Sequence, residues 1–349
     1  MNRQALLISL ALAFPCSALA DSEIYGVAHV SLDFVDDGAD SAHQLSSNAS
    51  RLGLRGYEDL GFGLMAIWQI ESDVNLTGGG GDWATRNSYV GLSGDWGKAL
   101  FGRHDTPYKL STGRLDVFAD TLADYNALMG NLFGTPWFDW RSDNTLMYMS
   151  PSMGGMSVNL AWSTDVRPGG DRPGYVDQSG RANDNNMLSL SVGYDLGPLY
   201  LTAAWERYRN DLYWADTDEA PDSTAAKLGG SYRLGMTTVN LAWERIDVGR
   251  TDRSGWYLSG RHDIGNSYLA AAYAQAQRLD GLPDSGASMF ALGGGYNFSS
   301  RTEIYALYTQ TQNDDEADYG LGFGGHGKPV YSLTGEKAHG VSFGVRHRF

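Results

Sequence analysis

Cysteine is almost absent from this 349-residue sequence, in which Cys16 is the only one. An intrachain disulfide and a cysteine-based metal site are therefore excluded. Long apolar runs are also missing, because no stretch after residue 20 approaches the roughly 18 consecutive apolar residues that a membrane-spanning helix requires. A helical membrane protein is excluded, whereas a barrel, whose strands need only about 9 to 11 residues each, is not.

Positive charge is scarce as well. The chain has 26 Lys and Arg against 41 Asp and Glu, a net charge of −15. Nucleic-acid binding relies on basic residues at phosphates, so we expect no nucleic-acid partner.

Patterns typical of catalysis are missing too. The seven histidines are scattered, without an HExxH or paired metal spacing, and there is no G-x-S-x-G elbow. The glycine-rich Gly320–Gly327 lacks the strand-to-helix context of a nucleotide fingerprint. We expect no enzyme, no cofactor and no metal, although a serine–histidine pair formed only by folding stays open.

The first twenty residues have the features of a secretory leader. Asn2 and Arg3 precede an apolar run over residues 5–14, and Ala18 and Ala20 form a small-residue cleavage signal. The sequence predicts a signal peptide over residues 1–20 that is removed before residue 21, with a short buried helix as the alternative. No linker or composition shift divides residues 21–349, which we interpret as one domain.

What the sequence contains in abundance is alternation. In the last twelve residues, one face carries the apolar Val341, Phe343, Val345 and Phe349 and the other carries Ser342, Gly344, Arg346 and Arg348. Strand side chains alternate with period two, so this pattern fits either a half-buried soluble strand or a strand between lipid and water. Sixteen segments with this period are predicted, at 23–34, 50–58, 62–74, 84–93, 97–103, 143–150, 156–163, 186–196, 199–209, 224–234, 237–247, 254–264, 267–277, 287–298, 301–311 and 338–349.

The connections alternate between tight turns and long acidic, glycine-rich segments. The long ones are 35–49, 75–83, 104–142, 164–185, 210–223, 278–286 and 312–337. A soluble sandwich has no reason to place its short turns at one end, whereas an outer-membrane barrel does. No internal repeat supports a propeller or solenoid. The predicted fold is all-β: a 16-stranded antiparallel transmembrane β-barrel whose first and last strands pair to close it.

Three segments resemble a known family. The sequences SRLGLRGYEDLGFGLMAIWQIESDVN (Ser50 to Asn75) and WATRNSYVGLSGDWGKALFGRHDTPY (Trp83 to Tyr108) closely resemble the Gram-negative general porins of the Neisseria and Comamonas type. RSDNTLMYMSP (Arg141 to Pro151) resembles that family's strand after the constriction loop, and Phe349 its assembly signal. The resemblance implies a homotrimer in the Gram-negative outer membrane, with each barrel a water-filled channel narrowed by an inward-folded third loop, and an assembly machinery that recognises Phe349.

The third loop, residues 104–142, is unusually apolar for an external segment. A loop packed against the inner wall would be apolar in this way, with its acids turned to the water path. The spacing of Asp116, Asp120 and Asp124 places all three on one side if this part is a short helix. The alternative is a helical face that is solvated outside the barrel.

The resemblance also implies a cluster of arginines on the facing wall. Leu52 and Leu54 must face lipid or a neighbouring subunit, so Arg51 and Arg55 face the lumen, since an arginine at mid-depth on the lipid face costs about 2 to 4 kcal/mol. Arg141 points inward by its phase. Taken singly, each arginine fits a structural salt bridge in the lumen equally well.

Two further arginines rest on weaker grounds. Arg86 is assigned by resemblance, because it shares parity with Val90 and Leu92. Arg103 shares parity with Phe101, so its inward orientation is the least supported.

Opposed rows of arginine and aspartate create a transverse field that admits small hydrophilic solutes and excludes large or apolar ones. The predicted function is passive diffusion of small hydrophilic solutes and ions, and the alternative is a substrate-specific channel with a solute-binding path. Met65 in place of an inward lysine of the family and the negative net charge favour a weak preference for cations. We interpret the acidic loops as solvated surface, with divalent-ion bridges to lipopolysaccharide as a second interpretation.

Overall fold

The computed structural model describes residues 21–79, 81–132, 134–164, 186–209 and 222–349. The predicted leader, residues 1–20, and most of two predicted external loops lie outside the described residues. Within them, one antiparallel sheet of seventeen strands forms the wall.

The wall strands correspond closely to the predicted segments. They are β1 (Asp21–Asp36), β2 (Ser41–Ser47), β3 (Arg51–Gly61), β4 (Leu64–Asp73), β5 (Ser88–Gly94), β6 (Gly97–Asp105), β9 (Arg141–Met149), β10 (Met156–Thr164), β11 (Asn186–Leu196), β12 (Leu199–Arg209), β13 (Ser223–Leu234), β14 (Thr237–Asp247), β15 (Asp252–Ile264), β16 (Ser267–Ala276), β17 (Ala287–Asn297), β18 (Thr302–Asn313) and β19 (Lys337–Arg348). Inside the wall lie α1 (Pro107–Thr112), the 3₁₀ turns η1 (Gly113–Leu115) and η2 (Tyr125–Ala127), and the short hairpin of β7 (Asn131–Leu132) and β8 (Thr135–Pro136). No helix in the described ranges is long and apolar enough to cross a membrane.

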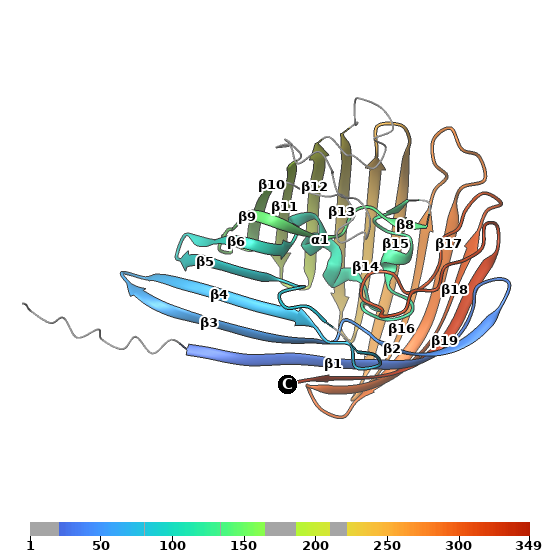
Figure 1. Ribbon diagram of the computed structural model, residues 1–349, viewed down its shortest axis with the longest axis horizontal. Coiled ribbons are helices and arrows are strands. Elements are labelled where there is room, and N and C mark those ends of the chain that lie inside the picture. The colour runs from blue at the N-terminus through green and yellow to red at the C-terminus, as the bar shows by residue number, and fades with distance from the viewer. Residues whose placement is uncertain (1–20, 80, 133, 165–185, 210–221) are drawn as a thin grey trace, which may run out of the picture.

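The sheet closes on itself as predicted. β1 pairs antiparallel with β19, from Val27 opposite Arg348 to Asp36 opposite His339. β2 and β3 occupy one position in the wall, because β2 pairs with the second half of β1 and β3 with the first half. Counting them as one interrupted strand gives the sixteen strands of the predicted barrel, which is confirmed (Figure 1). The prediction missed β2, which it placed in a loop.

Alternation decides which face of each strand points inward. In β14, Asn240, Ala242 and Glu244 are buried, whereas Val239, Leu241 and Trp243 between them are exposed. Exposed large apolar side chains recur at the outward positions of most wall strands, which is the pattern of strands that have lipid outside. The buried face belongs to the lumen, and its polar groups contact the segment that lies there.

Residues 106–140 cover the inner face of one side of the barrel. α1 contacts β11, β12 and β13, and Figure 1 shows it on the concave side of these strands. Apolar side chains of this segment, among them Leu115, Leu122 and Leu128, pack with inward residues of the wall in a buried cluster. The main apolar core therefore lies inside the barrel.

Candidate functional site

A cavity of about 870 Å³ lies inside the barrel between the wall on one side and residues 106–140 on the other. We call it the central cavity. Its lining includes the basic residues Arg86, Arg103, Lys109, Arg141 and Lys328 and the acidic residues Asp73, Asp116, Asp120 and Asp124. Three of the five predicted arginines and all three predicted aspartates therefore line one space.

Arg86 lies in the connection between β4 and β5, and its side chain extends into the lumen. β5 begins only at Ser88, so the predicted strand over 84–93 begins too early and its parity does not apply to Arg86. The Arg86 Nε donates to Glu71 Oε1 at 2.7 Å and Nη1 to Asp73 Oδ1 at 2.9 Å. Both acceptors are on β4, which fixes the guanidinium against the wall.

Arg103 points inward because of a bulge in β6. Gly102 has a φ of +149°, and the register with β9 shifts between Gly102 and His104. A bulge adds a residue to one strand and reverses the facing of those that follow. The outward Phe101 and the inward Arg103 can therefore share parity, and Arg103 pairs with Asp143 and donates to the Thr85 carbonyl at 3.0 Å.

Arg141 and Lys109 share one carboxylate. Arg141 Nη2 lies 3.1 Å from Asp105 Oδ1, and Lys109 Nζ lies at the same distance from it. Arg141 Nε also donates to Asn87 Oδ1 at 2.6 Å. Lys109 was missed by the sequence analysis; its position on the loop, four residues after Asp105, is the signal that could have identified it.

Arg51 and Arg55 do not line the central cavity. Arg51 Nε lies 3.9 Å from Glu71 Oε2, so it borders the same acidic residue as Arg86. Arg55 lies nearer the short turn after β3 and forms a 2.7 Å pair with Glu23, in which both side chains are more than half exposed. An ion pair with that exposure contributes little to stability.

The three acids do not form one helical face. Residues 116–124 form turns between η1 and η2 and not a helix. The carboxylates of Asp116 and Asp124 stabilise these turns by accepting hydrogen bonds from backbone N–H groups. Asp116 accepts from the N–H of Phe118 at 2.9 Å, of Tyr125 at 3.0 Å, and from the Tyr257 hydroxyl at 2.8 Å. Asp124 accepts from the N–H of Asp120 at 2.9 Å. Asp116 and Asp124 are buried, and only Asp120 is partly exposed.

Burial changes the charge of these acids. It raises the pKa of the Asp116 carboxyl to about 6, despite the hydrogen bonds that favour the ionised form. Burial, together with the charge of Asp116, raises the pKa of Asp124 well above its usual value. A raised pKa keeps a carboxyl neutral at higher pH, so Asp116 loses its charge near pH 6 and Asp124 stays protonated to a higher pH than an exposed aspartate does.

A pH-dependent selectivity follows from Asp116. As pH falls from 7.5 to 5, this carboxylate gains a proton, and the cavity becomes more favourable to anions. We expect the reversal potential in a KCl gradient to move toward the chloride potential over this range. The variant Asp116→Asn should start near the low-pH value and lose most of the shift. An unchanged shift in this variant would assign the titration to another group.

Two buried ion pairs fix the segment to the opposite wall. Lys227 of β13 pairs with Asp139, and the exposed fractions of their side chains are 0% and 1%. Glu244 of β14 pairs with Arg253 of β15 at 3.1 Å and accepts from the Gly130 N–H at 2.8 Å. These residues were missed, although charged residues on inward positions of strands are the signal that identifies them.

The last long connection also enters the lumen. Leu321 and Val330 form a β-bridge, and between them His326 Nε2 lies 3.0 Å from Asp33 Oδ2, with both side chains fully buried. Gly325 has no side chain because one would overlap the Asp120 carboxylate. This close approach explains the glycine at position 325. The same connection places the exposed Lys328 in the lining of the central cavity.

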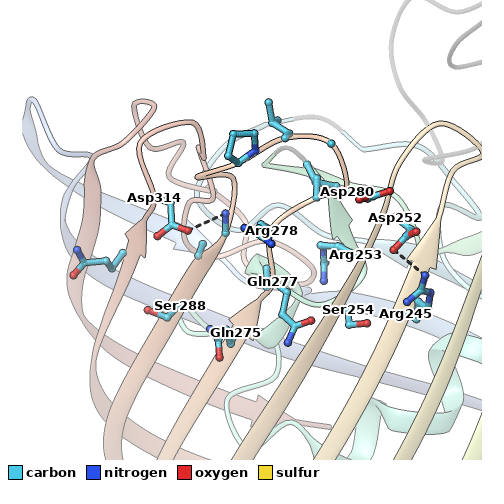
Figure 2. A pocket seen from close by; sticks show the side chains of 18 of the residues that line it. Arg245, Asp252, Arg253, Ser254, Gln275, Gln277, Arg278, Asp280, Ser288 and Asp314 are labelled. Atoms are coloured by element: carbon cyan, nitrogen blue, oxygen red, sulfur yellow. Dashed lines mark hydrogen bonds and ion pairs between the residues drawn. The ribbon is translucent and has the colours of Figure 1, made fainter.

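Figure 2 shows another cavity, of about 1010 Å³, near the long connections. Gln275 and Ser288 in its lining have the same strand parity as the exposed Leu269 and Phe290. This cavity, which we call the outer cavity, therefore opens on the outer face of the barrel.

The sequence of this chain is similar to those of known proteins. The sequence pattern of the family described as Gram-negative porin matches residues 5–316. Outer membrane porin protein 32 of Delftia acidovorans is 27% identical over 99% of this chain and all of that protein. Major outer membrane protein P.IB of Neisseria meningitidis is 26% identical over 82% of this chain and 93% of that protein.

The fold of this chain is similar to those of solved structures. The anion-selective porin from Comamonas acidovorans is 25% identical, with a TM-score of 0.79 over 95% of this chain and all of that chain. OmpT of Vibrio cholerae, solved in a trimer form, has a TM-score of 0.68 at 18% identity over 95% of this chain and 99% of that chain, and so shares the fold.

Proposed function

The chain belongs to the Gram-negative porin family and forms an outer-membrane channel for passive diffusion, and from this premise we propose that the central cavity is the constriction that selects solutes by charge. The observation that carries the proposal is the shared lining: Arg86, Arg103 and Arg141 face the same 870 Å³ space as Asp116, Asp120 and Asp124. A narrow water path between fixed charges of opposite sign orients dipolar solutes and ions.

The balance of charge supports a preference for anions, contrary to the weak cation preference expected from the sequence. Five basic residues line the cavity against four acidic ones, and burial raises the pKa of one of these acids, Asp124, well above its usual value. Lys328 carries a positive charge on the acidic side, and its ammonium group has no partner among the described residues. Local charges at a constriction outweigh distant loop charges because salt screens the latter over about 10 Å.

Planar-bilayer recording tests this function. We expect conductance that rises linearly with KCl up to the molar range and a reversal potential on the chloride side in a tenfold gradient. Conductance that saturates with one sugar or acid would instead support the alternative, a substrate-specific channel. A cation-side potential would contradict the charge assignment, and absence of pores would contradict the channel itself.

Membership of the family supports the remaining assignments, which are proposals. We propose that residues 1–20 are removed during export, that residues 21–349 are one domain, and that three copies assemble. Phe349 is half-exposed, exchanges backbone hydrogen bonds with Gly26 at the end of the barrel, and is proposed to be the residue that the assembly machinery recognises. We further propose that the protein catalyses no reaction.

Lipopolysaccharide is proposed to contact the outer cavity. Trp256 and Tyr273, with ring centroids 5.1 Å apart, lie beside it on the outer face, where aromatic side chains mark the edge of the hydrocarbon layer. Beyond them, the guanidinium of Arg278 has no partner among the described residues and is available to a phosphate (Figure 2).

A further inference from the structure

A second cavity lies in the lumen on the other side of residues 114–121 from the central cavity. It has a volume of about 490 Å³ and is near the short turns, which are periplasmic in outer-membrane barrels. We call it the periplasmic cavity. Its lining contains the five arginines Arg114, Arg233, Arg261, Arg346 and Arg348.

Two of these arginines lie over tyrosine rings. The Arg114 Cζ lies 3.6 Å from the ring centroid of Tyr200, and the Arg261 Cζ lies 3.6 Å from that of Tyr268. Stacking fixes the plane of a guanidinium and leaves its edge for planar acceptors. Each also has a carboxylate neighbour, since Arg114 pairs with Asp195 at 3.0 Å and Arg261 with Asp263 at 2.8 Å.

Arg346 connects the cavity to the loop above it. Its Nη2 donates to the Ala119 carbonyl at 2.8 Å, and its Nη1 lies 3.2 Å from Glu303. This arginine is therefore occupied, and it fixes the cavity's upper wall in position.

The other two arginines have no such partners. Among the described residues, no carboxylate or carbonyl accepts from the guanidinium of Arg233 or Arg348. Arg233 is on β13 and Arg348 on β19, two strands that are not neighbours in the sheet, and both side chains are exposed to the lumen. Two free guanidinium groups thus face one space from different parts of the wall.

The cavity has an excess of positive charge. Its acids are Asp116, Asp263 and Glu303, of which the last two pair with Arg261 and Arg346. Asp116 is bound by backbone N–H groups and a tyrosine hydroxyl, as described above. Thr238 and Ser231 add hydroxyl donors to the lining. The ligand that matches free guanidinium groups and hydroxyls is an oxyanion, because it accepts several charge-assisted hydrogen bonds at once.

We propose that the periplasmic cavity is a binding site for small oxyanions, with Arg233 and Arg348 as its principal ligands. This proposal rests on the proposed function, because anions reach the periplasmic cavity through the channel. An oxyanion bound there obstructs the path of chloride, so the site acts as a second selective stage in series with the constriction.

Blocking of the chloride current by inorganic phosphate tests the site. We expect phosphate to reduce single-channel KCl current in a saturable manner, and at lower concentration from the periplasmic side. The double variant Arg233→Gln/Arg348→Gln should need at least tenfold more phosphate for half-block. Each single variant is measured too, so that misfolding of the double variant still leaves a result.

The control is Arg301→Gln, which removes an exposed arginine at the same end of the barrel that does not line the cavity. It should keep the wild-type block. Equal block in the Arg233 and Arg348 variants, or no block of the wild type, would overturn the site. Titration calorimetry of phosphate with the purified protein separates this failure from failure of the channel function, because it requires no conduction.

Discussion

Replacing Lys227 with methionine is expected to detach residues 125–139 from the barrel wall. The Asp139 carboxylate would remain buried without its cation, and removing one partner of a buried ion pair costs about 3 to 5 kcal/mol. The barrel itself should persist, because its strands are held by backbone hydrogen bonds. We expect larger and noisier single-channel currents, together with amide exchange in residues 125–139 that is faster by a factor of 100 or more.

Adding a second substitution, Asp139→Asn, to Lys227→Met should restore the attachment of residues 125–139 to the wall. In Lys227→Met/Asp139→Asn, the buried charge is gone, and asparagine tolerates the positive φ of +69° at this position. This double variant should recover quiet currents. Lys337→Met, which removes an exposed lysine at the start of β19, is the control and should behave as wild type. Wild-type noise and exchange in Lys227→Met would show that the pair does not hold the segment.

Replacing Arg141 with glutamate is expected to shift the channel toward cations more than any other single change in the constriction. Arg141 lines the central cavity beside Lys109, and its loss leaves Asp105 with the ammonium group of Lys109 and the side-chain amide of Asn87. An ion 5 Å from a unit charge in water gains or loses about 0.8 kcal/mol, so a change of two charges should alter the cation-to-anion permeability ratio by about tenfold or more.

The measurement is the reversal potential in a KCl gradient. Arg141→Gln should produce about half the shift and guards against misfolding caused by the glutamate. Arg301→Glu makes the same charge change in an exposed turn and should shift the potential little.

Arg55→Glu tests whether Arg55 belongs to the constriction. Its pair with Glu23 is half-exposed and lies outside the central cavity, so we expect a small shift of the reversal potential. A shift as large as that of Arg141→Glu would place Arg55 in the constriction.

Strand prediction succeeded where alternation was regular and failed where a local irregularity intervened. The segment of β2 has little apolar alternation, with Leu45 as its single large apolar residue, so it resembled a loop. Gly102 is the only sequence sign of the bulge that turns Arg103 inward, and a lone glycine does not specify a bulge. Period-two reasoning assumes continuous pairing, which these positions do not have.

The acidic residues show a different limit. A spacing of four is a correct signal for one face of a helix, but Asp116 and Asp124 instead accept backbone N–H groups and form turns. Short polar side chains compete with the helix for these donors, and only the surroundings decide the outcome. Whether a carboxylate faces water or is buried under a glycine-rich loop likewise depends on contacts between residues that are far apart in the sequence.

The sequence by itself determined most of the wall: the sixteen strand positions, the facing of the regularly paired strands, the closure of the first strand on the last, and the end at which the long connections lie. These follow from a period of two and from the cost of placing charge on a lipid face, both of which are local. Only the tertiary structure decided what fills the lumen. Lys227 and Asp139, or Asp33 and His326, are far apart in the chain, and their pairing depends on two long connections folding into the same space.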